Sequence, residues 1–358
     1  MLPKPLPELE KPSKVVPVLG GLAVCAIGGA VCAWLRTPLP WMIGSILAMS
    51  AVQMAGARFE PLPGGRDAGM LVVGVSLGLY FTVPVLQEVA TYWPWFVFLG
   101  FAAIGFGAAA ALVLMRFARV DRATAYFASM PGGASEMSIV GEKHGAAPDR
   151  VAFAHSFRML IVVTVIPVSI TLAGFSATED YRPVTVPFEA TGLAILFGAA
   201  AMAGFLARRI GAPTAFTLGP LFLTIALTAS GLQLSSVPTP FTNAAQVLLG
   251  CALGARFDRS FLVIAPRFVA ALVPSIAVML GLAALVGWLI AVTSGAYLGT
   301  ALLSAAPGGI AEMSITAKVL RIGVAFVTAA HVVRYLIVVL FTVPVYRLLE
   351  GARARISR

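Results

Sequence analysis

Runs of about 18 or more residues with few polar side chains recur along this chain, and they limit the folds that it can adopt. Each run is long enough to cross the hydrocarbon of a bilayer as a helix, because about 20 helical residues span it. Only 11% of the residues are charged and 59% are hydrophobic, unlike a soluble domain. The runs are Val15–Leu35, Trp95–Met115, Arg158–Phe175, Thr191–Ala207, Phe268–Val292 and Val324–Leu348. The sequence therefore predicts an all-α polytopic membrane protein whose surroundings are the lipid bilayer.

The formal charge of +10 does not indicate a nucleic-acid partner, because the basic residues fall almost wholly in the connections between apolar runs. Cytoplasmic loops of membrane proteins carry such an excess of Lys and Arg. The three cysteines, Cys25, Cys32 and Cys251, all lie inside apolar runs and are interpreted as small buried residues. Neither a disulfide framework nor a metal or other cofactor is predicted.

The chain contains an internal duplication. Thr124–Val163 aligns with Thr300–Val339 without a gap, and 17 of the 40 aligned positions are identical. Near the start, Pro38 matches Pro213 in an alignment that differs from the first by one position. We therefore expect two repeats with similar segments, at 15–175 and 190–350. They are joined by an acidic linker at 176–189 and flanked by tails at 1–14 and 351–358.

The orientation of the two repeats depends on whether the motif segment Ala123–Val140 crosses the membrane or folds back. If it folds back as a re-entrant hairpin, each repeat has about five crossings and the second repeat is inverted; a broken crossing helix would make the repeats parallel. The inverted arrangement leaves 19 of the 25 basic residues on one side, in agreement with the positive-inside rule. We therefore expect inverted repeats in a bacterial inner membrane, with both termini cytoplasmic and the linker outside.

The central motif is a Pro-Gly-Gly break followed by Glu-Met-Ser, once in each repeat. Proline removes a backbone donor and the two glycines tolerate unusual conformations, so together they interrupt a helix inside an apolar stretch. Interrupted backbone at membrane depth is tolerated only where it is buried in protein or lines a watery cavity. The residues are Pro131, Gly132, Gly133, Glu136 and Ser138 in the first repeat and Pro307, Gly308, Gly309, Glu312 and Ser314 in the second. We predict ion or substrate binding here, although each Glu could simply complement a helix dipole.

A His and an Arg three residues apart share one face of the last helix of each repeat, as His155 with Arg158 and His331 with Arg334. An Arg at membrane depth costs about 2.5–3.5 kcal/mol or more, so a partner or a function is expected. The matching carboxylates are Glu136 and Glu312, which leaves a structural Glu–Arg pair and a functional site as two compatible hypotheses. The spaced glycines Gly74-x3-Gly78 and Gly250-x3-Gly254 are typical of close helix packing.

At the doubled motif the sequence resembles the membrane AbrB-type family of duplicated bacterial membrane proteins, whose members carry labels such as putative ammonia monooxygenase or regulator of gene expression. The resemblance extends over nearly the whole chain. The pattern of broken helices is also similar to that of inverted-repeat transporters, although a fold pattern does not establish a function.

Three functions are weighed. The first is a secondary transporter of a small solute, an organic anion or an amino-acid-like compound, coupled to protons or a cation at Glu136 and Glu312. The second is a membrane protein that regulates gene expression indirectly. The third is a metal-dependent monooxygenase, which is disfavoured because the two arginines would repel a metal held by the neighbouring histidines. No enzyme activity is therefore expected; the expected partners are a small-molecule substrate and a coupling ion, and a homodimer is left open.

Overall fold

The computed structural model of the protein describes residues 15–175, 186–257 and 266–356, and all regular elements in these ranges are α-helices. The predicted tail at 1–14 and most of the predicted linker lie outside the described residues. The first half contains α1 (Val15–Trp34), α2 (Pro40–Met54), α3 (Gly65–Gly78), α4 (Val83–Thr91), α5 (Trp93–Ala118), α6 (Arg122–Ser129), α7 (Ala134–Glu142) and α8 (Pro148–Leu172). The second half contains α9 (Ala190–Arg209), α10 (Ala215–Ala229), α11 (Thr239–Gly254), α13 (Pro266–Ser294), α14 (Leu298–Ala305), α15 (Ile310–Leu320) and α16 (Val324–Ile356).

The helices of the second half begin where the duplication predicts. The alignment that matches Pro38 with Pro213 also matches the starts of α1 and α2 with those of α9 and α10. The alignment that matches Thr124 with Thr300 does the same for α6, α7 and α8 with α14, α15 and α16. Helices α2, α3, α4, α10 and α11 lie outside the six apolar runs named in the sequence. The last helix also continues past residue 350, where the predicted tail begins.

Six described helices are long and apolar enough to cross a membrane, namely α1, α5, α8, α9, α13 and α16. The shorter helices α2, α3, α10 and α11 have 14 to 16 residues, about 21–24 Å at 1.5 Å per residue. Helix α3 is joined to α4 by a bend of 92°. The all-helical membrane architecture is thus confirmed, and that the four short helices also cross the membrane stays a prediction.

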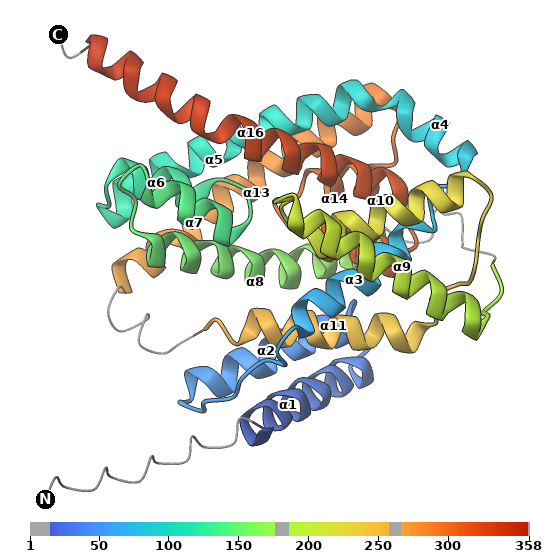
Figure 1. The fold of residues 1–358 in the computed structure, drawn as a ribbon. Helices are drawn as coiled ribbons and strands as arrows, with labels where there is room; N and C mark the ends of the chain where they lie inside the picture. Colours follow the sequence, from blue (N-terminus) through green and yellow to red (C-terminus); the bar gives the residue numbers. More distant parts are fainter. Residues whose placement is uncertain (1–14, 176–185, 258–265, 357–358) are drawn as a thin grey trace, which may run out of the picture.

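Glycines allow helices from different halves to lie against each other (Figure 1). A Cβ at Gly74 would lie 2.6 Å from the carbonyl oxygen of Thr217, and Gly78 lies against Thr224, so α3 packs directly on α10. In the same way Gly250 and Gly254 pack α11 on α2. The predicted packing role of these glycines is confirmed, and the halves share one core.

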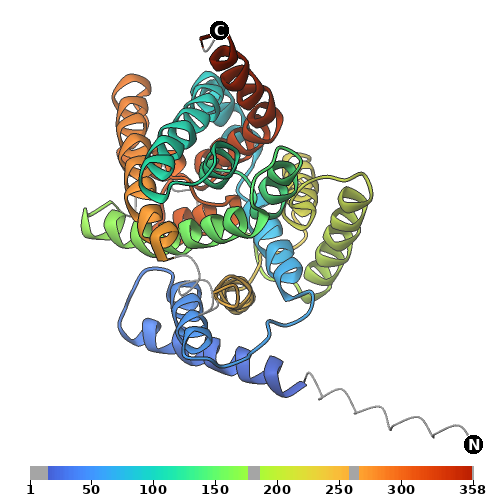
Figure 2. The same cartoon turned by 90° about the vertical axis from the view of Figure 1, so that its left-hand side faces the viewer.

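The contacts also fix the directions of counterpart helices. Gly65 lies against Leu248 and Gly69 against Ala245, so sequence numbers rise along α3 as they fall along α11, and the two helices are antiparallel. Figure 2 shows α11 end-on, passing between α1–α2 and the rest of the molecule. Antiparallel counterparts are what an inverted duplication requires. The orientation of the halves in a membrane stays a prediction.

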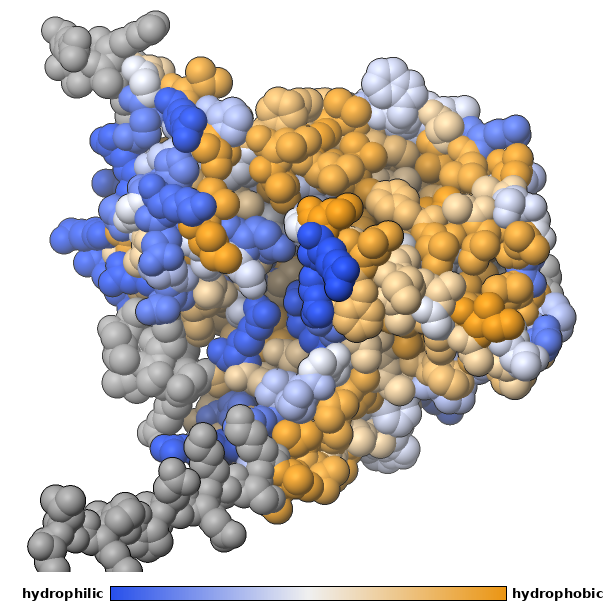
Figure 3. Space-filling view, in the orientation of Figure 1, coloured by the Kyte–Doolittle hydropathy of each residue, from blue (hydrophilic) through white to orange (hydrophobic). Residues whose placement is uncertain are grey.

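The described surface is divided in the way that a membrane protein requires. In Figure 3, hydrophilic residues gather at the end that carries the C-terminus and the α7–α8 connection, and apolar residues cover most of the remaining face. Exposed large side chains such as Leu19, Ile27, Leu112, Met202 and Leu285 would be costly in water but are suited to lipid. The hydrophilic end is therefore expected to face the cytoplasm.

Cysteine labelling tests this topology. In a variant without the native Cys25, Cys32 and Cys251, a cysteine placed by Asp180→Cys should react with a membrane-impermeant maleimide added outside intact cells. The control Lys143→Cys, at the hydrophilic end, should react only after permeabilisation. The reverse pattern would contradict the predicted orientation.

Candidate functional site

The first Pro-Gly-Gly break joins α6 to α7 in a hairpin. Helix α6 begins where the Asp121 carboxylate accepts a hydrogen bond from the Thr124 backbone N–H at 2.7 Å, and it ends at the extended residue Met130. The Ala147 N–H, beyond the end of α7, donates to the Thr124 hydroxyl at 2.8 Å. Because the two ends of the segment are bonded to each other, the segment folds back and is not a broken crossing helix.

The second break forms the same hairpin from α14 and α15. The Gly323 N–H donates to the Thr300 hydroxyl at 3.2 Å, and the duplication aligns these two residues with Ala147 and Thr124. Gly309 begins α15 with an extended backbone, as Gly133 begins α7. The alternative left open by the sequence is thus resolved in favour of two re-entrant hairpins.

The two motif arginines bind the broken backbone and do not pair with the glutamates. The Arg158 guanidinium on α8 donates to the carbonyls of Met130 at 2.7 Å and Gly132 at 3.2 Å. Arg334 on α16 donates to the equivalent carbonyls of Ala306 and Gly308. The hypothesis of a structural Glu–Arg pair is therefore wrong for the described residues. The ion pair in the described structure joins Arg122 to Glu350, neither of which belongs to the motif.

The physical reason for this correction lies at the helix ends. The last carbonyls of α6 and α14 have no intrahelical donors and point into an apolar interior, where an unbonded carbonyl is costly. A guanidinium offers a fork of donors and a charge that complements the negative end of each short helix. Arg158 and Arg334 are 4% and 2% exposed, so each clamps its hairpin to the long helix behind it.

The two glutamates lie in the first turns of α7 and α15 and fold back over the glycines of the break. A Cβ at Gly133 would lie 2.7 Å from the Glu136 carboxyl carbon, and one at Gly309 would lie 3.0 Å from that of Glu312. A carboxylate in this place complements the positive end of the helix, as one of the two hypotheses expected. Glu136 also accepts a hydrogen bond of 3.3 Å from the Tyr335 hydroxyl.

The remaining motif residues have mainly local partners. His155 and His331 each direct Nδ1 at the carbonyl four residues earlier, at 2.8 and 2.9 Å, and their Nε2 atoms have no partner in the described structure. The Ser138 hydroxyl donates to the carbonyl of Ala134 at 2.7 Å. The equivalent Ser314 is fully buried, and its hydroxyl has no hydrogen-bond partner in the described structure.

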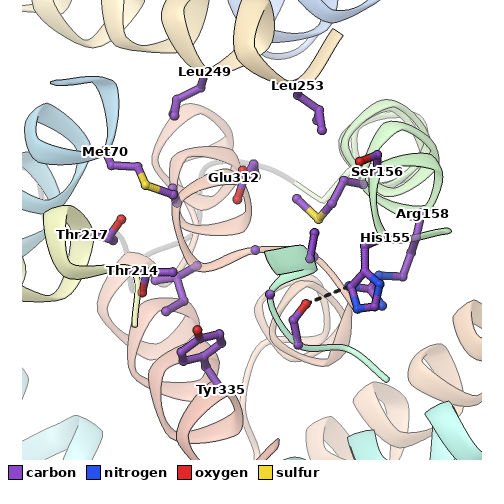
Figure 4. A pocket seen from close by; sticks show the side chains of 18 of the residues that line it. Met70, His155, Ser156, Arg158, Thr214, Thr217, Leu249, Leu253, Glu312 and Tyr335 are labelled. Carbon is purple, nitrogen blue, oxygen red and sulfur yellow. Dashed lines mark hydrogen bonds between the residues drawn. The ribbon is translucent and has the colours of Figure 1, made fainter. Parts of the chain in front are cut away.

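Both breaks open onto one cavity of about 120 Å³, large enough for several water molecules or a small solute (Figure 4). Motif residues that line it are Pro131, Gly132, Gly133, His155, Arg158, Gly308, Gly309, Glu312 and Arg334. Glu136 does not line the cavity but accepts a hydrogen bond from Tyr335, which does. His331, Ser138 and Ser314 are not among the lining residues. The duplicated motif thus contributes to a single site from both halves.

Other lining residues carry no motif and were missed in the sequence. Arg66 precedes Met70 on α3, Arg256 follows the end of α11, and Thr214 and Thr217 lie at the start of α10. Among the described residues, four guanidinium groups therefore line the cavity against the single lining carboxylate of Glu312. This lining therefore favours a negatively charged ligand.

The cavity reaches solvent at the end where Arg66 and Arg256 lie. Arg66, in the first turn of α3, is exposed, whereas Tyr80, just past the other end of α3, lines a separate cavity with Tyr92 and Tyr297. The first hairpin is partly open to solvent around Ala134. Its counterpart Ile310 is buried, and so is the preceding break residue Gly308. The two equivalent hairpins therefore lie in different environments.

The donor set does not fit a metal site. In the ranges that the structure describes, no three His, Cys, Asp or Glu side chains lie close enough together to hold a metal ion. His155 and Glu312 line the cavity, but the guanidinium groups of Arg158 and Arg334 lie there with them.

Comparison with known proteins shows the family of the chain. A family model described as transition state regulatory protein AbrB matches residues 41–350. The chain is 25% identical over 370 residues to a Bacillus subtilis protein named uncharacterized protein YhjN, covering 96% of this chain and 95% of that one. It is 23% identical over 299 residues to an Escherichia coli protein named putative regulator AbrB, covering 83% and 86% of the two chains.

Proposed function

The chain belongs to the AbrB family, and from this premise and the geometry of its cavity we propose that it is a secondary transporter of a small organic anion, coupled to protons. The observation that carries the proposal is the convergence of two broken-helix hairpins, one from each half, on one cavity lined by buried arginines. Discontinuous helices in transporters bind substrates and coupling ions with their half-helix ends. We place the protein in the bacterial inner membrane with both termini cytoplasmic, because its basic residues gather at one end.

The charge of the site supports an anionic substrate. The N-termini of α7 and α15 face the breaks and carry partial positive charge. Arg66 and Arg256 add two guanidinium groups to those of Arg158 and Arg334. In a setting of low dielectric constant these groups attract an anion more strongly than they would in water.

The unequal environments of the two hairpins support a moving site. A transporter must expose its site to one side at a time, and the cavity reaches solvent near the first hairpin while the second is buried. Because the repeats have the same helices, exchanging their environments would open the opposite side. The cavity at the other end of α3 lies where such an outer path would begin.

A regulatory role, as the name of the Escherichia coli relative says of that protein, is the second candidate. It is compatible with transport, since altered solute levels can change gene expression indirectly. A metal-dependent monooxygenase is disfavoured, because the donor set of the cavity, among the described residues, does not fit a metal.

Transport is tested in vesicles that contain the purified protein. With an imposed pH gradient, labelled carboxylates such as lactate, malate and citrate are offered one at a time, and uptake is compared with protein-free vesicles. We expect accumulation of at least one anion that collapses when a protonophore removes the gradient. Binding of an anion without any movement across the membrane would contradict the proposal.

A further inference from the structure

Buried polar atoms without partners are concentrated in the cavity. Of the twelve such atoms in the described part of the chain, five belong to residues that line it. They are the Thr214 and Thr217 hydroxyls and the atoms His155 Nε2, Arg158 Nε and Arg334 Nε. A buried polar group without a hydrogen bond is costly, so such a concentration points to a ligand that supplies the missing partners.

Thr214 and Thr217 lack the helical acceptor that several other threonines of this chain use; Thr224 and Thr228, further along α10, are also without a hydrogen-bond partner in the described structure. Thr164, Thr316 and Thr328 donate to the carbonyl four residues earlier in their helices, at 2.7–2.8 Å. Thr214 precedes α10 with φ 44° and ψ 42°, and Thr217 lies in its first turn, so no helical carbonyl stands four residues before either of them. Thr217 is only 1% exposed.

The matching positions of the first half show which part of this arrangement is special. Leu39 precedes α2 with φ 47° and ψ 52°, so the left-handed conformation belongs to both repeats. The alignment that matches Pro38 with Pro213 places Thr214 on Leu39 and Thr217 on Met42, which have no hydroxyl. The hydroxyl pair is therefore a feature of one wall of the cavity.

The opposite wall carries the groups that suit an anion. Figure 4 shows Thr214 and Thr217 on one side, His155 and Arg158 on the other, and Glu312 between them. The guanidinium groups of Arg158 and Arg334 supply donors and positive charge there, whereas Nε2 of a neutral His155 can only accept, for example from a ligand hydroxyl. A ligand that occupies the whole cavity thus meets charge at one end and uncharged hydroxyls at the other.

We propose that the substrate is a hydroxycarboxylate, with its carboxylate at the arginine wall and its hydroxyl at Thr217 and Thr214. This inference rests on the proposed function and names the substrate class of the same cavity. A hydroxyl both donates and accepts, so it can satisfy two threonine hydroxyls. Thr217 is the specificity-determining residue because it is deeply buried, whereas Thr214 also lies near the Tyr335 hydroxyl.

An ammonium group suits the threonine wall less well. The available carboxylates are Glu312 in the cavity lining and Glu136 behind Tyr335. Each is folded over a glycine at the start of its own helix, and Glu136 already accepts a hydrogen bond from Tyr335. The lining also carries more guanidinium groups than carboxylates. An amino acid therefore gains less in this site than the hydroxy acid of the same skeleton.

The test measures binding to the purified full-length protein by isothermal titration, at one fixed pH, with acids of matched skeleton. The series are propionate, lactate and alanine; succinate, malate and aspartate; and tricarballylate with citrate. We expect the hydroxy acid of the fitting skeleton to bind about 10- to 100-fold more tightly than its deoxy partner. Thr217→Val should reduce this ratio to near 1, and the melting temperature of the variant shows that it is folded. The control Thr164→Val, whose hydroxyl bonds within α8, should keep the ratio.

Each other outcome has a defined meaning. Equal binding of hydroxy and deoxy acids, or an unchanged ratio in Thr217→Val, overturns the hydroxyl subsite and leaves the anion transporter standing. Tightest binding of the amino acid overturns it in favour of a carboxylate, Glu312 or Glu136, as the counter-ion of an ammonium group. Failure of every carboxylate to bind overturns the substrate class of the proposed function itself.

Discussion

Replacing Arg334 by methionine is expected to lower the free energy of unfolding by about 2–4 kcal/mol. The substitution leaves the carbonyls of Ala306 and Gly308 buried without donors, at about 1–3 kcal/mol each, and relief from burying a charge offsets part of this. Arg334→Lys should recover only part of the loss, since an ammonium lacks the planar fork that reaches both carbonyls. The measurements are the apparent melting temperature in detergent and the yield of monodisperse protein.

The equivalent substitution in the first half is expected to cost less. Arg158 bonds Gly132 at 3.2 Å, and this hairpin is partly open to solvent, so water can replace the lost donor. Arg256→Met is the matched control, because Arg256 also lines the cavity but is exposed. Equal stability of the Arg334→Met and Arg256→Met variants would show that the clamp does not hold the hairpin.

The clamp illustrates what the sequence could not predict. The spacing of His155 and Arg158 places both on one face of α8, but the partners of the arginine are backbone carbonyls. Every residue has a carbonyl, so the sequence does not show which of them will bind a guanidinium group. Acidic side chains are the arginine partners that can be identified from a sequence, so the pairing hypothesis was based on Glu136 and Glu312. Their own helix N-termini were the nearer partners.

The duplication, by contrast, made much of the fold predictable. Proline and glycine act locally, so the breaks, the helices on both sides and their recurrence in the second half follow from the residues themselves. The walls of the cavity depend on how α3, α10 and α11 pack, and periodicity does not encode that. Thr214 could have been noticed as the polar counterpart of the apolar Leu39.

The second large effect is expected from Glu312→Gln, which should leave the fold intact and abolish the dependence of anion transport on protons. The Glu312 carboxylate lies over Gly309 at the start of α15, where a substrate anion would also be attracted. Two like charges about 4 Å apart repel by about 4 kcal/mol at an effective dielectric constant of about 20, roughly a thousandfold in affinity. Protonation of Glu312 removes this repulsion, so proton and anion favour each other's binding.

The sign of the pH dependence follows from this coupling. In the unmodified protein, anion affinity should fall by at least about 10-fold as the pH rises through the ionisation of Glu312, because the anion then meets a carboxylate. In Glu312→Gln the affinity should stay high and nearly constant, and a pH gradient should no longer drive uptake.

Glu136→Gln should have a milder effect on proton coupling, since a glutamine oxygen can still accept the Tyr335 hydrogen bond. Glu142→Gln, an exposed substitution at the end of α7, is the control and should behave as the unmodified protein. Uptake in vesicles at several pH values, together with the melting temperature of each variant, separates coupling from stability. Normal proton-driven uptake by a Glu136→Gln, Glu312→Gln double variant would remove both carboxylates from the coupling mechanism.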